Sequence, residues 1–321
     1  MRRAREVDVD ALVAAARAAS PRAVARLITL VENGDPALPQ IMASLAPHTG
    51  HASIIGLTGS PGVGKSTTTT MLVHAFREEG KRVGVLAVDP SSPFSGGALL
   101  GDRIRMVDHS ADPEVYVRSM ASRGHLGGLS WATPQALRVL DGAGCDVVIV
   151  ETVGVGQSEV EIAGLADTTV VLLAPGMGDG VQAAKAGILE VGDVFVVNKA
   201  DRDGADATVR ELRHMISLGD RSEPGVWRPP VLKTIADRAE GRDEVMEALA
   251  KHRSHGVASG ALHARRAARA RREVEAIVLA KLQRKIGQLD SGEALPHLAD
   301  QVAAGQIDPY AAAENVLAEL S

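Results

Sequence analysis

The chain has 321 residues, of which 45% are hydrophobic and only 2% aromatic, and its formal net charge is −5. This length allows one large α/β domain with extensions, and the negative charge argues against a bulk nucleic-acid-binding protein. A single cysteine, Cys145, excludes a disulfide framework and a cysteine-based metal cluster; its setting in CDVVIV is typical of a small buried residue. No apolar run reaches the ~20 residues of a membrane helix. The first residues are basic, but no apolar stretch follows them, so a signal peptide is not expected. The sequence therefore predicts a cytoplasmic protein without a membrane anchor.

Residues 1–50 are predicted to form short helices. In SPRAVARLITLVENG, Ser20 is expected to cap a helix that has Pro21 at its first position and ends before Gly34. Apolar residues recur there at helical spacing, so one face of this helix must pack against another element. These residues are Val24, Leu27, Ile28 and Val31.

From about residue 52, short apolar runs alternate with helical segments. The runs are SIIGLTG, RVGVLAVD, CDVVIVE, TTVVLLA and DVFVVN, with VLKTI as a plausible last strand. Continuous rather than alternating hydrophobicity is typical of strands that are buried on both faces. This rhythm predicts an α/β fold with a doubly wound, mostly parallel sheet.

After about residue 255 the strand pattern stops. Residues 261–286 carry eight Lys or Arg against two Glu, and without aromatic residues this indicates the solvated side of a helix rather than a nucleic-acid surface. A helical stripe of apolar residues lies in the same segment: Val274, Ile277, Val278, Leu282 and Ile286. A final helix is expected with Asp308 as its cap and Pro309 directly behind the cap. We therefore divide the chain into an N-terminal helical extension (1–50), a nucleotide-binding domain (51–254) and a C-terminal helical extension (255–321).

Residues 59–66, GSPGVGKS, match the phosphate-binding loop pattern G-x-x-x-x-G-K-[ST] between a predicted strand and a predicted helix. Glycines allow successive N–H groups to point at phosphate oxygens, and the helix N-terminus adds positive potential. Lys65 is expected to bridge the β- and γ-phosphates, and the Ser66 hydroxyl to ligate Mg²⁺. The predicted phosphate-binding residues are Gly59, Ser60, Pro61, Gly62, Val63, Gly64, Lys65, Ser66 and Thr67. The predicted fold is therefore that of a P-loop NTPase.

The segment VVNKAD ends the fifth apolar run with the pattern N-K-x-D. The Asp201 carboxylate can accept hydrogen bonds from N1–H and the 2-amino group of guanine, and adenine offers a donor at neither place. A site built for these bonds rejects the base that lacks them. The stem of Lys199 can lie across the purine ring, and Asn198 can bond the base edge or tie loops together. GTP and GDP are therefore the expected nucleotides.

Acidic residues follow other apolar runs and are candidates for the magnesium shell. Asp89 ends the second run, Glu151 ends the next, and Asp102 lies between them in a glycine-flanked loop. Carboxylates beside a P-loop can reach Mg²⁺ directly or through water. We expect Ser66, Asp89, Asp102 and Glu151 to form the metal shell, and Lys65, Asp102 and Glu151 to serve catalysis.

A second glycine-rich segment, APGMGDGVQAAKAG at residues 174–187, follows another strand. Three glycines within five residues favour mobility. Gln182 and Lys185 are three apart on the helix expected after them and so share a face. Residues 174–187 are a candidate switch.

Together these motifs resemble the MeaB-type P-loop GTPases, also called ArgK, of the SIMIBI class, a family that includes the human methylmalonic aciduria type A protein. The resemblance spans roughly residues 20–250. It rests on GSPGVGKST, VLAVDPSSPFSGGALLGDRIRM, SRGHLGG, ETVGVGQSEVEIAGLAD, GDGVQAAKAGILE and NKAD.

The resemblance implies a homodimeric GTPase chaperone of the adenosylcobalamin-dependent methylmalonyl-CoA mutase, one that gates cofactor loading and protects the mutase. It implies that residues 174–187 contact the mutase, with Gln182 and Lys185 in that switch. No cobalamin site of its own is expected, because cofactor handling would belong to the mutase. The family often has Ser-Ala in the last guanine-contacting loop, where this sequence has Ile235, Ala236 and Asp237.

Two other functions stay open at this point. A nickel or cobalt metallochaperone GTPase would use Cys- or His-rich segments, and KHRSHGVASGALH, with His252, His255 and His263, comes closest. Lys251 and Arg253 beside these histidines would repel a cation. A small-molecule kinase would need an acceptor site, and none is readable in the sequence.

Overall fold

The computed structural model of the protein describes residues 8–89, 112–121, 132–152, 158–176, 189–218, 225–290 and 294–320. The strands are β1 (Ser53–Thr58), β2 (Val83–Asp89), β3 (Val115–Ala121), β4 (Val147–Thr152), β5 (Thr168–Leu173), β6 (Val194–Val197) and β7 (Val231–Lys233). The helices are α1 (Val9–Arg17), α2 (Pro21–Glu32), α3 (Leu38–Leu45), α4 (Lys65–Glu78), α5 (Thr133–Gly142), α6 (Ser158–Leu165), α8 (Leu189–Val191), α9 (Ala205–Leu218), α10 (Arg242–Ala258), α11 (Ala261–Asp290), α12 (Ala294–Ala303) and α13 (Pro309–Leu320). Two short 3₁₀ turns, η1 (Ala46–His48) and η4 (Ala236–Arg238), complete the described elements.

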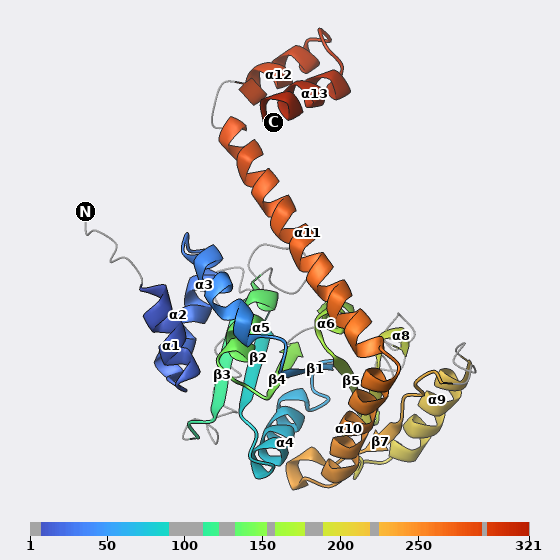
Figure 1. Ribbon diagram of the computed structural model, residues 1–321. Helices are drawn as coiled ribbons and strands as arrows, with labels where there is room; N and C mark the ends of the chain where they lie inside the picture. The colour runs from blue at the N-terminus through green and yellow to red at the C-terminus, as the bar shows by residue number, and fades with distance from the viewer. Residues whose placement is uncertain are drawn as a thin grey trace. The chain divides into compact units, whose positions relative to one another are not determined.

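The seven strands form one sheet in the order β3-β2-β4-β1-β5-β6-β7, and every neighbouring pair is parallel (Figure 1). The chain winds outward from β1 in both directions, as in a doubly wound sheet. The predicted fold class is confirmed, and all six strands expected from the apolar runs are present. Because the strands are parallel, their carboxyl ends meet at one edge of the sheet, called here the carboxyl edge, and their starts meet at the opposite amino edge.

One strand, β3, was missed by the search for apolar runs. It is the outer strand of the sheet and pairs with β2 alone. Its Val117 is 36% exposed, whereas Tyr116 and Met120 are buried. An edge strand is buried only in part and mixes polar with apolar residues, so a search for continuous runs overlooks it.

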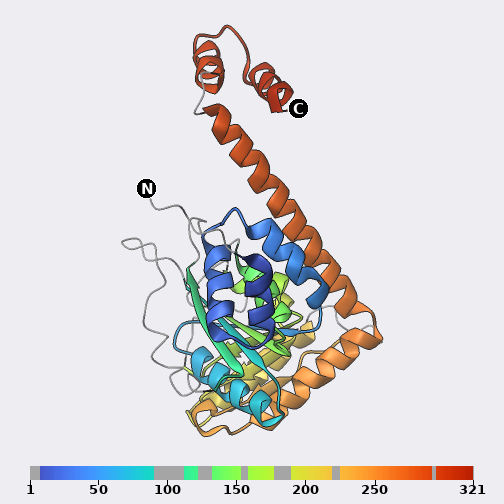
Figure 2. The same cartoon turned by 60° about the vertical axis from the view of Figure 1, so that its left-hand side comes forward.

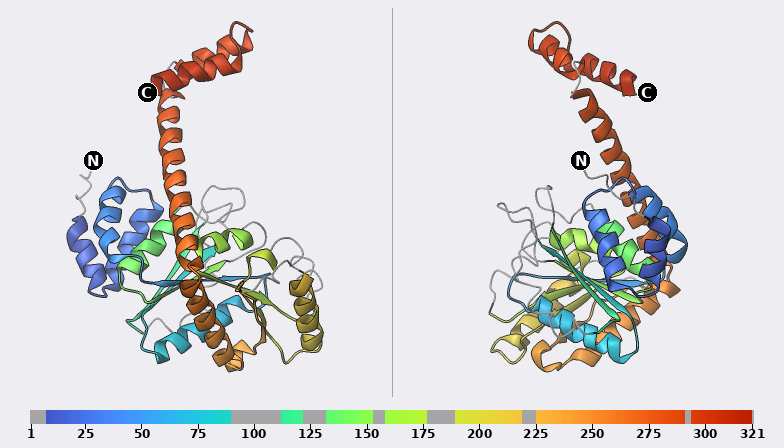
Figure 3. Two further views of the ribbon diagram at one scale, coloured as in Figure 1. Left: turned by 45° about the vertical axis from the view of Figure 1, so that its right-hand side comes forward. Right: turned by 90° about the vertical axis from the view of Figure 1, so that its left-hand side faces the viewer.

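Helices cover both faces of the sheet, and alternate residues of β1 pack on opposite sides. Ile54 packs in one core cluster with residues of α5 and α6, whereas Ile55 and Leu57 pack in another with residues of α4 and α10. α9 packs against β6 and β7 through a third cluster and lies beside the sheet edge (Figure 3). Cys145 is 2% exposed, as predicted, and this burial raises the pKa of its thiol above the usual range.

The N-terminal helices pack beside α5 and β3 (Figure 2). The predicted helix from residue 21 is confirmed as α2, with the Ser20 hydroxyl accepting from the Ala23 N–H. The predicted apolar face of α2 is entirely buried. A partly buried ion pair, in which Arg118 Nη2 of β3 lies 2.5 Å from Glu32 Oε2, adds a polar contact between this extension and the sheet.

The chain divides into two compact units, Met1–Arg266 and Ala267–Ser321. In the second unit α12 packs on α13, and Asp308 caps α13 as expected by accepting from the N–H groups of Tyr310 and Ala311. The apolar stripe of α11 is exposed to solvent at Val274, Ile277, Val278 and Leu282. Among the described residues, every helix is too short or too polar to cross a lipid bilayer.

Candidate functional site

The phosphate-binding loop joins the carboxyl end of β1 to the start of α4, as its motif predicts. Gly59 and Gly64 both have positive φ angles, of 140° and 98°, which side-chain-bearing residues rarely adopt. A Cβ atom on Gly59 would collide with the Leu172 carbonyl oxygen, and one on Gly64 would collide with the Asn198 amide. These glycines therefore allow the loop to curl tightly between β5 and the segment after β6.

Lys65 is the first residue of α4 and is 8% exposed. Its ammonium donates hydrogen bonds to the carbonyl oxygens of Gly59, at 2.5 Å, and Ser60, at 3.2 Å. The lysine thus holds its charge inside the curl of the loop. A phosphate bound there would meet this charge together with the N-terminus of α4.

Two hydroxyl groups of α4 hold the carboxylate of Glu151 at the carboxyl edge. Ser66 Oγ donates to Glu151 Oε1 at 2.6 Å, and Thr69 Oγ1 lies 2.9 Å from Glu151 Oε2. Glu151 is 2% exposed, and a buried carboxylate requires such donors. Of these three residues, sequence reasoning missed Thr69, although its position three after Ser66 places it on the same helix face.

The donor chemistry here suits magnesium. Hydroxyl and carboxylate oxygens are the hard ligands that Mg²⁺ prefers, and Ser66 and Glu151 bring both together beside the P-loop. Asp89 is the last residue of β2, one position beyond the Val88–Thr152 pairing, and so also reaches the carboxyl edge. The fourth predicted member of the shell, Asp102, lies outside the described residues, as do Gln182 and Lys185 of the candidate switch.

Asn198 links three segments of the site. Its Nδ2 donates to the Val63 carbonyl of the P-loop at 2.8 Å. Its Oδ1 accepts from the Thr234 hydroxyl at 3.1 Å and from the Ala236 N–H at 3.0 Å. Of the two roles offered for this residue, the structure has the one in which it ties loops together. The role of Thr234 was not predicted, because nothing in its local sequence identifies its partner.

Of the other two residues of N-K-x-D, Lys199 contacts the same loop. Lys199 has a positive φ of 57°, and its Nζ donates to the Gly62 carbonyl at 2.6 Å. Asp201 is 41% exposed at its side chain and lies 3.9 Å from Arg238, a long and exposed ion pair that contributes little. The Asp201 carboxylate is thus accessible to solvent.

The last predicted guanine-contacting loop follows β7. Ile235 precedes η4 and forms an isolated antiparallel bridge with Glu240, Ala236 is buried, and Asp237 is exposed. By the resemblance to the family, the Ala236 N–H would be the group that reaches the guanine O6 atom. In the structure this N–H donates to Asn198 Oδ1 instead. The loop is therefore bonded to the N-K-x-D segment although it lacks the serine that is common in the family.

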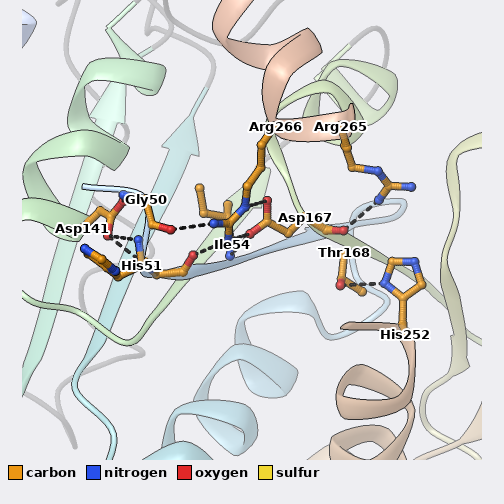
Figure 4. A network of polar contacts seen from close by, with 10 residues as sticks. Gly50, His51, Ile54, Asp141, Asp167, Thr168, His252, Arg265 and Arg266 are labelled. Atoms are coloured by element: carbon orange, nitrogen blue, oxygen red, sulfur yellow. Dashed lines mark hydrogen bonds and ion pairs between the residues drawn. The ribbon is translucent and has the colours of Figure 1, made fainter. Parts of the chain in front are cut away.

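The amino edge carries a polar network that sequence reasoning missed. Asp167, directly before β5, accepts from the Ile54 N–H and from Arg266, at the start of α11, and Arg266 also donates to the Gly50 and Ala52 carbonyls (Figure 4). Asp141 of α5 accepts from the N–H groups of the chain at 50–52. These partners lie far apart in the sequence, so no local pattern indicates them. The network stabilises the entry to β1, away from the P-loop.

A third carboxylate of this edge, Asp193, is bound by Arg265 at 2.7 Å and by His252 Nε2 at 3.2 Å. His252 Nδ1 lies 2.8 Å from the Thr168 hydroxyl, so both ring nitrogens have partners in the network. Within the described ranges, no group of three or more His, Cys, Asp or Glu side chains could hold a metal ion.

Burial alone would raise the pKa of Asp193, but the hydrogen bonds from His252 and Arg265 outweigh it and lower this pKa to about 2.

This lowered pKa predicts a specific acid sensitivity. The stabilising contribution of ionised Asp193 is fully present above its ordinary pKa of 3.8 and is lost as the pH falls through about 2. Between pH ~5 and ~2 the wild type should lose about 2 kcal/mol more unfolding free energy than Asp193→Asn, measured by urea unfolding. The control is Asp206→Asn, since Asp206 is 73% exposed in a surface pair. Equal pH profiles for the wild type and Asp193→Asn would contradict this prediction.

Comparison with known proteins gives consistent matches. The family model of methylmalonyl Co-A mutase-associated GTPase MeaB matches residues 24–290. A relative from Pyrococcus abyssi, with GTPase in its name, is 48% identical over 314 residues, 97% of each chain. The mouse mitochondrial methylmalonic aciduria type A homolog is 42% identical over 216 residues, 66% of this chain and 52% of that protein. The crystal structure of an LAO/AO transport system kinase matches with a TM-score of 0.71 and 26% identity, covering 99% of both chains.

Proposed function

Because the chain belongs to the methylmalonyl Co-A mutase-associated GTPase MeaB family, we propose that it is a GTP-hydrolysing chaperone of a cobalamin-dependent acyl-CoA mutase. In this role it gates adenosylcobalamin loading and protects the mutase, and methylmalonyl-CoA mutase is the first candidate partner. The family description and the likeness to the mouse methylmalonic aciduria type A homolog support this partner. The cobalamin-binding groups are those of the mutase.

One observation carries the nucleotide part of the proposal. Asn198 and Lys199 donate to the P-loop carbonyls of Val63 and Gly62, so the base-reading segment is fixed directly to the phosphate loop. A purine beside Asp201 and a triphosphate on Lys65 would then belong to the same molecule. This arrangement supports GTP and GDP as the bound nucleotides.

Magnesium would be held by Ser66, with Asp89, Asp102 and Glu151 completing the shell directly or through water. Bound there, it would supply positive charge to the β- and γ-phosphate oxygens. Lys65 would add its own charge, and the main-chain N–H groups of residues 62–66 would orient the phosphates. Hydrolysis is expected to be slow without the mutase, because no arginine finger is recognisable in the sequence and such a group contributes a large rate effect.

The two extensions are proposed to serve assembly. Residues 1–50 support the nucleotide-binding domain (51–254), and residues 255–321 contribute a contact between two copies of the chain. The exposed stripe of α11 supports this dimer, since Val274 is 60% exposed and Val278 is 50% exposed. Gln182 and Lys185 are proposed to contact the mutase.

Steady-state GTP hydrolysis, measured with and without a purified cobalamin-dependent mutase, tests the proposal. We expect the mutase to raise kcat for GTP at least about tenfold, because the partner completes the transition-state contacts. The two proteins should also co-elute in at least one nucleotide state. The matched control is an acyl-CoA enzyme that carries no cobalamin.

Measuring where the γ-phosphate goes in the same assay distinguishes a GTPase from a small-molecule kinase. Release of all transferred phosphate as inorganic phosphate, without an added acceptor, supports the GTPase. Appearance of a phosphorylated small molecule would support a kinase instead. An unchanged kcat together with separate elution in every nucleotide state would overturn the mutase partnership.

A further inference from the structure

A hydroxyl–carboxylate–hydroxyl chain, Ser66–Glu151–Thr69, lies at the junction of α4 and the carboxyl end of β4. Ser66 Oγ and Thr69 Oγ1 contact different oxygens of the same carboxylate, at 2.6 and 2.9 Å. A carboxylate held at one oxygen can rotate about its terminal torsion, which is broad and permissive. Held at both, it is fixed in its plane.

Thr69 has two acceptors within reach but only one proton. Its Oγ1 lies 3.1 Å from the Lys65 carbonyl, the usual back-bond of a helical threonine, and 2.9 Å from Glu151 Oε2. An ionised carboxylate oxygen is the stronger acceptor, and here it is also the nearer one. Thr69 is 0% exposed, so water does not compete for this proton.

The orientation of Glu151 determines what Ser66 can do. A serine hydroxyl has one proton and two lone pairs. When it donates that proton to Glu151 Oε1, its lone pairs remain as the acceptors that a hard cation uses. If the carboxylate turned, the Ser66 proton would lose its fixed direction and the lone pairs would lose theirs.

We infer that Thr69 is a positioning residue of the magnesium site, acting through Glu151 on Ser66. This inference rests on the proposed binding of Mg²⁺ and guanine nucleotide. Residues that hydrogen-bond to a metal ligand commonly change metal affinity by about tenfold or more when they are lost. Thr69 thus contributes to metal affinity without touching metal or nucleotide.

The test is Thr69→Val, which replaces the hydroxyl by a methyl group of similar size, compared with Thr69→Ser, which keeps the hydroxyl. GDP affinity is measured by fluorescence titration across free Mg²⁺ concentrations and in EDTA. We expect Thr69→Val to raise the half-saturating Mg²⁺ concentration by about tenfold and to leave GDP affinity in EDTA within about twofold. Thr69→Ser should stay within about twofold of the wild type on both measures.

A second background makes the route of the effect testable. When Glu151→Gln is already present, Thr69→Val should cause little further change in the half-saturating Mg²⁺ concentration (the Mg²⁺ half-point), because the effects of substitutions in residues that act as one unit do not add. Thr69→Ala, a smaller hydroxyl-free variant, must shift the half-point in the same direction and decides the matter should Thr69→Val not fold.

Three results would overturn the inference: an unmoved Mg²⁺ half-point in Thr69→Val, an equal shift in Thr69→Ser, or a full shift in the Glu151→Gln background. Failure of the wild type to bind GDP at any Mg²⁺ concentration is a different outcome. It would overturn the proposed function itself, and this distinguishes the two failures.

Discussion

Asp201→Asn is expected to lower the affinity for GTP by at least about a hundredfold and to raise the affinity for XTP. The carboxylate is proposed to accept from two guanine donors, and an amide would replace one acceptor oxygen by a donor. Xanthine carries a carbonyl where guanine has its 2-amino group, so the asparagine amide finds an acceptor there. Competition titration with GTP, XTP and ATP in the presence of Mg²⁺ measures the change.

The structure makes this test specific. The Asp201 carboxylate is partly exposed, and its 3.9 Å approach to Arg238 is too long and too solvated to add much stability. The substitution should therefore leave the fold intact. The control is Asp203→Asn, because Asp203 is an exposed aspartate two residues further along the same loop. Unchanged selectivity in Asp201→Asn would refute the assignment of guanine recognition to this residue.

Lys65→Ala is expected to weaken GTP binding by at least about a hundredfold while leaving GMP binding nearly unchanged. The ammonium is the buried cation of the P-loop, 2.5 Å from the Gly59 carbonyl, and hydrogen bonds to charged groups are worth about 1.5–3 kcal/mol each. Its predicted contacts are with the β- and γ-phosphates, which GMP lacks. Calorimetric titration with GTP, GDP and GMP gives the comparison.

Lys81→Ala is the matched control, since the Lys81 side chain is partly exposed and pairs with Glu79 away from the P-loop. Thermal unfolding without nucleotide checks that loss of the two loop hydrogen bonds has not unfolded the P-loop variant. Equal losses of GTP and GMP affinity would indicate a collapsed loop rather than a lost phosphate contact.

Local sequence patterns predicted the parts of the site that depend on backbone conformation. The loop with Gly59 and Gly64 lies between a strand and a helix as its motif requires, because few residues other than glycine adopt its positive φ angles. The cap of α2 at Ser20 followed from the same kind of local rule. β3 did not follow, because partial burial at a sheet edge gives no continuous apolar signal.

The contacts between distant segments were beyond such patterns. The bonds of Asn198 join residues 63, 198, 234 and 236, and the Arg266 network joins residues 50, 52, 167 and 266. Each of these side chains has many acceptable partners when read alone. Only the order of the parallel strands brings the particular ones together.

The sequence alone determined the alternating elements of a parallel sheet and predicted the chemistry proposed for this protein: a phosphate loop, a carboxylate for the base and a set of acidic oxygens for the metal. Glycine conformation, helix capping and strand hydrophobicity act over a few residues, so the sequence suffices for them. The tertiary structure decided which hydroxyl holds Glu151, which N–H takes the oxygen of Asn198 and which arginines neutralise Asp167 and Asp193. These pairings are set by distances of a few ångströms between residues that lie 38 to 99 positions apart in the sequence, and only the folded sheet fixes such distances.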